Sequence, residues 1–133
     1  PYTTLFRSNT EHRLLQAERD KTEDNTIILH DFFYKNYDLK IKYDPSDPLK
    51  PFVEFDDQII GSTAEAFGTI YGNGKLMCTQ PVAYDSYYNV CQKFVFLYST
   101  IYVVGKGTVG TYVNILEWIS DEEAEQYKKE EGL

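Results

Sequence analysis

The residues Val90 to Val104, VCQKFVFLYSTIYVV, decide the fold of this chain. Large apolar side chains alternate along the first part of this run, so they point to opposite faces of an extended strand. One face carries Phe94, Phe96 and Tyr98, and the other carries Val95 and Leu97. Because both faces are apolar, the run predicts a strand that is central in a sheet or lines a filled barrel. Ser99 and Thr100 mark a break or bend, after which strand-forming residues continue to Val104.

Shorter strand-like runs lie on both sides of this stretch. The clearest is Tyr37 to Tyr43, where apolar and polar residues alternate, so Leu39 and Ile41 are expected to face the core. Asn73-Gly74, between two such runs, predicts a two-residue type I′ hairpin turn. Together the runs give eight strand candidates: residues 26–34, 37–43, 52–55, 61–71, 75–80, 90–98, 101–104 and 108–118.

Eight strands joined by short turns predict an all-β domain over residues 26–119. The favoured architecture is a small antiparallel up-and-down barrel of about eight strands, because closing a sheet removes its exposed edges. A β-sandwich is the alternative. A barrel of this size is either filled by side chains or holds one small ligand.

The two ends of the chain differ from this middle part. Residues 120–133 begin with the capping box Ser120-Asp121-Glu122-Glu123 and predict an acidic C-terminal α-helix that ends near Gly132. Residues 9–25 are polar and predict a leader that is either a short surface helix or disordered. Residues 1–8, PYTTLFRS, match a translation of the end of a common sequencing adapter. They are therefore expected to be an artefact outside the fold, with the natural N-terminus missing and the cellular location open.

The charge of the chain argues against two classes of partner. There are 13 Lys and Arg residues against 21 Asp and Glu residues, which gives a formal net charge of −8. An acidic chain lacks the basic surface that nucleic-acid binding needs, and anionic membranes repel it. No apolar run approaches the length of a transmembrane helix. The sequence therefore predicts neither a nucleic-acid nor a membrane partner.

No known catalytic or cofactor motif is present in the sequence. Phosphate-binding loops, nucleophile elbows and zinc spacings are missing, so no cofactor and no metal site are expected. His30 and Asp31 are adjacent on a strand candidate and are expected to point to opposite faces. Glu54 and Glu65 are the candidate catalytic residues, because a carboxyl group inside a barrel has a raised pKa and can act as acid or base. The alternative is that both face water.

Aromatic side chains are the candidate ligand-binding residues. The chain has twelve Tyr and eight Phe residues, which suit an apolar interior wall as well as ordinary strand surfaces. Five are expected to line the interior: Phe94, Phe96, Tyr98, Tyr71 and Tyr112. Cys78 and Cys91 lie on consecutive strand candidates. They are either reduced core thiols or, if the turn between them centres near Tyr84-Asp85, partners in a disulfide.

Three parts of the region from Phe55 to Gly107 resemble the allene oxide cyclase and dirigent barrel superfamily. They are residues 55–61 (FDDQIIG), residues 68–71 (GTIY), and the strand pair 89–96 (NVCQKFVF) and 101–105 (IYVVG). The resemblance covers less than half of the chain, and residues 108–111 only partly match the Gly-rich turn that follows in the family. It implies an eight-stranded barrel, often oligomeric, with an apolar cavity. Family members cyclise a fatty-acid epoxide or orient phenoxy radicals, and no catalytic residue of theirs maps onto this chain.

Three functions fit these features. The first is a small β-barrel that binds an apolar or aromatic small molecule in its interior. The second is a cyclase or isomerase-type enzyme on the same barrel, with Glu54 or Glu65 as its carboxylate. The third is a non-catalytic interaction or structural subunit with a filled interior and the terminal helix as a docking arm. An apolar pocket without ionisable residues favours the first, a pocket with a carboxylate the second, and a packed interior the third.

Overall fold

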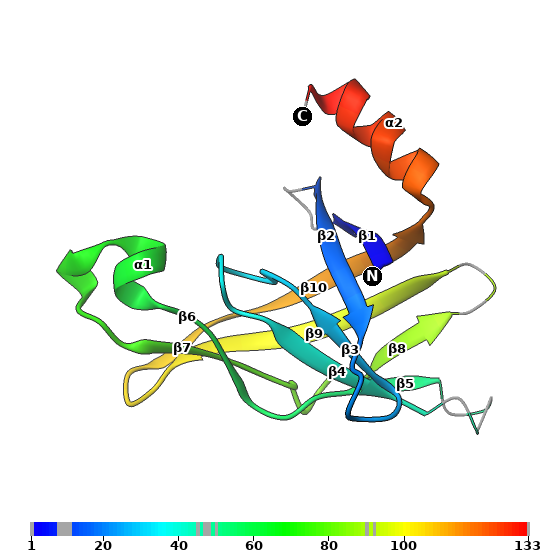
Figure 1. Cartoon of the computed structure of the whole chain (residues 1–133). Coiled ribbons are helices and arrows are strands. Elements are labelled where there is room, and N and C mark those ends of the chain that lie inside the picture. Colours follow the sequence, from blue (N-terminus) through cyan, green and yellow to red (C-terminus); the bar gives the residue numbers. More distant parts are fainter. Residues whose placement is uncertain are drawn as a thin grey trace.

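The chain forms one antiparallel β-sheet with short helical segments and a C-terminal helix (Figure 1). The computed structural model describes residues 2–7, 12–44, 46, 49, 51–89, 91 and 93–132, and at residues 2–7, 12, 13, 71 and 131 it describes the backbone alone. The predicted antiparallel all-β fold with a C-terminal α-helix is confirmed.

Ten strands lie within the described residues. They are β1 (Tyr2–Arg7), β2 (His12–Arg19), β3 (Thr26–Leu29), β4 (Leu39–Tyr43), β5 (Phe52–Glu54), β6 (Gln58–Ser62), β7 (Lys75–Thr79), β8 (Ser86–Asn89), β9 (Phe94–Val103) and β10 (Gly107–Ile119). The helical segments are α1 (Thr63–Phe67), the 3₁₀ turn η1 (Thr69–Tyr71) and α2 (Asp121–Glu131).

Eight of these strands follow one another in hydrogen-bonded order: β10, β1, β2, β3, β4, β5, β8 and β9. β9 also pairs with β10, so the order returns to its start. Among the described residues, β5 joins β4 and β8 through two residue pairs each, so the order passes through short junctions there and the sheet is not closed. The choice between barrel and sandwich therefore stays a prediction.

The hairpin of β6 and β7 departs from a simple up-and-down order. β8 pairs with the first residues of β9, and β7 pairs with its last residues on the same side. β6 and β7, together with the far halves of β9 and β10, form an arm that extends away from the other strands and carries α1 and η1 near its end (Figure 1).

The structure of the arm differs from two predictions made for residues 61–74. Residues 61–71 were expected to be a strand, and Asn73-Gly74 the centre of a two-residue turn. Instead, Ser62 caps α1 by accepting a hydrogen bond from the backbone N–H of Glu65, and β6 pairs with β7 across a longer connection. The buried Thr63 hydroxyl closes that connection, since it accepts from the Gly74 N–H at 2.8 Å and donates to the Gly72 carbonyl at 3.0 Å. The helix-start pattern Ser62-x-x-Glu65 thus prevails over strand propensity.

The N-terminal segments were wrongly left out of the fold. Tyr2–Arg7 forms β1, which pairs with both β2 and β10, and the expected leader contains β2. Leu15 and Ala17 on β2 are 2% and 1% exposed, because their apolar side chains alternate with the outward Gln16 and the partly exposed Glu18. The charged residues on both sides of Leu15 and Ala17 made the segment look like a solvent-exposed leader, although these two residues have the spacing of a strand.

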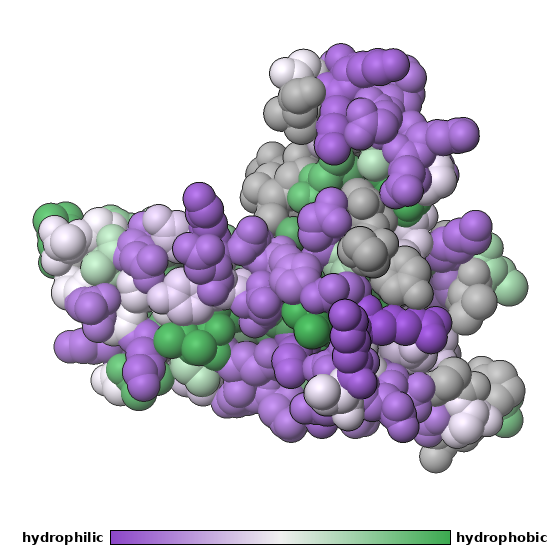
Figure 2. Space-filling view, in the orientation of Figure 1, coloured by the Kyte–Doolittle hydropathy of each residue, from purple (hydrophilic) through white to green (hydrophobic). Residues whose placement is uncertain are grey.

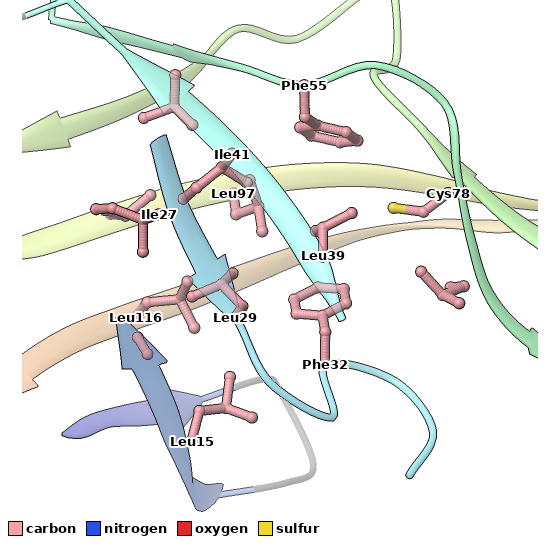
Figure 3. Packing of buried hydrophobic residues seen from close by; sticks show 14 of the residues in the cluster. Leu15, Ile27, Leu29, Phe32, Leu39, Ile41, Phe55, Cys78, Leu97 and Leu116 are labelled. Carbon is pink, nitrogen blue, oxygen red and sulfur yellow. The ribbon is translucent and has the colours of Figure 1, made fainter. Parts of the chain in front are cut away.

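One apolar cluster fills the space between β2, β3 and β4 on one side and β9 and β10 on the other (Figure 3). Leu39 and Ile41 are 0% and 2% exposed, which confirms that this face of β4 is buried. On β9 the buried side chains are Val95, Leu97, Ser99 and Ile101. The cluster continues into the arm through Phe55, Ile60, Leu76 and Cys78.

The C-terminal helix matches its prediction. Ser120 and Glu123 form the capping box, Gly132 adopts a left-handed conformation just after the helix, and the first turn is acidic. Ala124 of this helix is buried. The helix α2 follows directly after β10 (Figure 1).

Candidate functional site

A cleft of about 1150 Å³ opens at the end of the sheet where β10 meets α2. Its apolar lining consists of Ile27, Ile41, Tyr43, Pro51, Val53, Tyr88, Val95, Trp118 and Ile119. Its polar and charged lining consists of Arg19, Asn89, Cys91, Lys93, Glu117, Ser120 and Glu123. The cleft therefore continues the apolar interior of the sheet outward to a polar rim.

Strand alternation places the aromatic walls of this cleft. Tyr43 lies two residues after Ile41, Tyr88 two after Ser86, and Trp118 two after Leu116, so each shares the face of a buried residue. The rings of Tyr43 and Tyr88 meet edge to face, with centroids 6.0 Å apart. The Tyr88 hydroxyl donates to the Asp44 carbonyl at 3.1 Å.

Backbone contacts hold the two ends of the cleft in place. The Tyr88 N–H donates to the Pro51 carbonyl at 2.9 Å, and the Trp118 N–H donates to the Lys93 carbonyl at 3.0 Å. Lys93 has a positive φ of 56°, a conformation that turns the chain into β9. The wall is thus supported by main-chain hydrogen bonds as well as by side-chain packing.

The aromatic residues expected to bind ligand lie elsewhere. Phe94, Phe96 and Tyr98 occupy the outer face of β9, where the Tyr87 ring stacks on Phe96 at 5.1 Å and the Tyr84 ring stacks on Tyr98 at 5.2 Å. The prediction that they line the interior is wrong, because the narrower Val95 and Leu97 fill it. The cross-strand stacking of Tyr87 on Phe96 contributes to sheet stability.

The other two predicted ligand-binding residues lie on the arm. Tyr112 is 44% exposed and sits six residues before Trp118, about 20 Å along β10. Tyr71 belongs to η1, and its side chain lies outside the described residues. On the face shown in Figure 2, hydrophobic residues are visible at the far end of the arm, along the lower middle of the molecule and beneath α2, between larger hydrophilic areas.

The two candidate catalytic carboxylates do not enter the cleft. Glu54 is exposed on β5. Glu65 lies in α1 rather than on a strand, is also exposed, and accepts hydrogen bonds from the Tyr37 hydroxyl at 2.7 Å and the Ser62 hydroxyl at 3.0 Å. The expectation of a carboxylate in apolar surroundings is therefore corrected for both residues.

The two cysteines are free thiols in different environments. Cys78 is fully buried, and burial raises its pKa to about 12, with the nearby Asp57 charge adding to the effect and a hydrogen bond with Ser99 opposing it. Cys91 is exposed at the rim of the cleft. The disulfide alternative is excluded, and only Cys78 is the core thiol that the other alternative described.

A second, shallower hollow of about 700 Å³ contains His30. Its imidazole Nε2 lies 3.0 Å from Glu18 Oε1 on β2, and its Nδ1 lies 3.1 Å from Asp38 Oδ1. Partial burial disfavours the charged imidazole, but the hydrogen bonds and charges of Asp38 and Glu18 outweigh it and raise the pKa of His30. The two carboxylates that contact this imidazole, those of Glu18 and Asp38, are thus close in space but come from other parts of the sequence.

The raised pKa of His30 predicts a pH-dependent contribution to stability. Its contribution is complete below the ordinary value of 6.5 and is lost as pH rises through the higher folded value. His30→Gln is therefore expected to cost more free energy of unfolding at about pH 6 than at about pH 9, as measured by urea denaturation. Proton NMR of His12→Gln, in which His30 is the only histidine left, gives the pKa directly. A pKa at or below 6.5 contradicts the prediction.

Two kinds of site are absent from the part of the chain that the structure describes. In these residues no group of three or more His, Cys, Asp or Glu side chains is placed to hold a metal ion. No helix among them combines the length and apolar character needed to cross a membrane.

Comparison with known proteins gives one family. Neither the curated proteins nor the solved structures contain a match to this chain. A family model described as "Domain of unknown function (DUF4984)" matches residues 1–130. The match includes the residues that form β1, which counts against their origin in an adapter. The chain therefore belongs to the DUF4984 family of domains.

Proposed function

We propose that this domain binds an apolar small molecule in the cleft between the sheet interior and α2. The observation that carries the proposal is a space of about 1150 Å³ whose inner walls are aliphatic and aromatic and whose polar groups gather at the rim. Ligand sites for small molecules have this composition and a comparable volume. The resemblance to the cyclase and dirigent superfamily stays a prediction, and the proposal does not rest on it.

The walls supply the main driving force for such binding. Ile27, Ile41, Val53 and Val95 are buried at the floor, and Tyr43, Tyr88 and Trp118 stand above them. An apolar ligand there removes its own surface and that of the aromatic walls from water. The cleft does have two carboxylates in its lining, Glu117 and Glu123, but Glu123 is engaged in capping α2 and the buried lining is aliphatic. Since the candidate catalytic residues Glu54 and Glu65 also lie outside the cleft, we propose binding without a catalytic step.

Trp118 offers a direct test, because it is the only tryptophan in the chain and lines the cleft. The probe N-phenyl-1-naphthylamine absorbs where tryptophan emits, so binding beside Trp118 quenches its fluorescence by energy transfer. A saturable titration with a Kd of about 1–100 μM is expected. Phe96→Leu, on the outer face of β9, is the matched control and should leave the titration unchanged.

Blocking the rim gives a second readout of the same site. Cys91 is exposed whereas the Cys78 thiol is buried with a raised pKa, so N-phenylmaleimide should modify Cys91 alone. The adduct is expected to weaken probe binding by about fivefold or more, since it occupies part of the cleft. Cys91→Ser treated in the same way should keep its affinity. No saturable signal, or a loss of signal in Phe96→Leu alone, would contradict the proposed function.

A further inference from the structure

We infer that the ligand of this cleft is an uncharged apolar molecule rather than an amphipathic anion such as a fatty-acid carboxylate. This inference rests on the proposed function and concerns the class of ligand. It is carried by the way in which the protein's own charges are arranged around the opening.

The rim has no excess of positive charge to attract an anion. Its described cations are Arg19 and Lys93, and its described anions are Glu117 and Glu123, so their formal charges cancel. The chain as a whole carries −8. An anion approaching the cleft therefore meets a neutral rim in a negatively charged protein, which slows its encounter and weakens its binding.

The helix terminus beside the cleft is already neutralised. The N-terminal end of a helix attracts anions through its unpaired N–H groups and its dipole. In α2 the Ser120 hydroxyl accepts from the Glu123 N–H at 3.1 Å, and the Glu123 carboxylate accepts from the Ser120 N–H at 3.3 Å. Three carboxylates, those of Asp121, Glu122 and Glu123, occupy the first turn. The protein itself thus fills the place where a ligand carboxylate or phosphate would bind.

The inner part of the cleft offers no cation to an anionic ligand. Among the described lining residues, the buried ones are Ile27, Ile41, Val53 and Val95, and the charged ones are exposed except for Glu117, a half-buried anion. The Tyr88 hydroxyl is engaged with the Asp44 carbonyl. Moving an ionised group into such surroundings without a partner is strongly unfavourable, whereas an uncharged ring or chain is not penalised.

A matched pair of probes tests this inference. N-phenyl-1-naphthylamine and 8-anilino-1-naphthalenesulfonate share one ring system and differ by a single sulfonate. Both are titrated against the Trp118 signal of the full chain, from about 0.02 M to about 0.5 M NaCl, a range that screens surface charges progressively. The uncharged probe is expected to bind about tenfold more tightly or better at low salt. The affinity of the sulfonate should stay constant or rise as salt increases, because salt screens repulsion.

Arg19→Gln separates a hydrophobic preference from a charge effect. If no ion pair with Arg19 holds the sulfonate, the substitution changes the two affinities by nearly the same factor at about 0.5 M NaCl, where the loss of one positive charge from the rim is largely screened. The inference is overturned if the sulfonate binds as tightly as the uncharged probe, or if it loses affinity with salt and selectively in Arg19→Gln. In either of those cases the proposed function stands, since a ligand still binds beside Trp118. If neither probe gives a saturable signal, the proposed function itself fails and the inference with it.

Discussion

A chain that begins at Asp20 is expected not to fold. It lacks β1 and β2, so β3 and β10 each lose a hydrogen-bonded neighbour, and the core loses Leu15 and Ala17. A small domain is stable by only about 5–15 kcal/mol. The deletion removes two of the eight strands that follow one another from β10 to β9, so the loss is expected to exceed that margin. Circular dichroism during thermal unfolding should show no cooperative transition, whereas the full chain shows one.

Single substitutions on β2 test the same point without shortening the chain. Leu15→Asp places an unpaired carboxyl group where the wild-type side chain is 2% exposed and should destabilise the domain severely. Gln16→Asp introduces the same charge one residue further on, where the side chain faces outward, and should cost less than about 1 kcal/mol. Equal urea midpoints for the two variants would show that β2 is the dispensable leader suggested by its composition.

The contrast between β2 and β4 shows what sequence alone can and cannot decide. In Tyr37 to Tyr43 apolar and polar residues alternate without interruption, and the burial of Leu39 and Ile41 follows directly. In β2 only Leu15 and Ala17 carry the same period, between charged residues that suggest a solvated segment. The decisive contacts are the hydrogen-bonded pairings of β2 with its sequence neighbours β1 and β3, which the residue pattern of β2 by itself does not report.

The interior of β9 was ambiguous for another reason. Both of its faces are apolar, so the period of two identifies a strand but does not say which face is inside. The structure places Val95 and Leu97 inside, and the rings of Phe96 and Tyr98 pack outside on Tyr87 and Tyr84. The cleft residues Tyr43 and Trp118 carried the better signal, because each continues the buried series of its own strand.

Ile60→Ala is expected to lower the free energy of unfolding by about 2–5 kcal/mol, the range for truncating a buried isoleucine. Ile60 is 0% exposed and belongs to the part of the core that anchors the arm. Its neighbour Ile59 is 40% exposed, and Ile70 at the end of the arm is 85% exposed. The same substitution should therefore cost about 1 kcal/mol or less at Ile59 and nearly nothing at Ile70. Urea unfolding of the three variants measures all of these differences.

The irregularity in β6 explains why two adjacent isoleucines differ so much. Gln58 and Ile59 pair with Cys78 and Met77, and after a register shift Gly61 pairs with Leu76. The extra residue lets Ile60 and Gly61 both be buried, although strict alternation would bury only one of them. A Cβ at Gly61 would lie 3.4 Å from the Cβ of Tyr34, so this face of β6 is closely packed. Equal losses at Ile59 and Ile60 would mean that β6 runs without this shift, and the arm would then present a different face to the core.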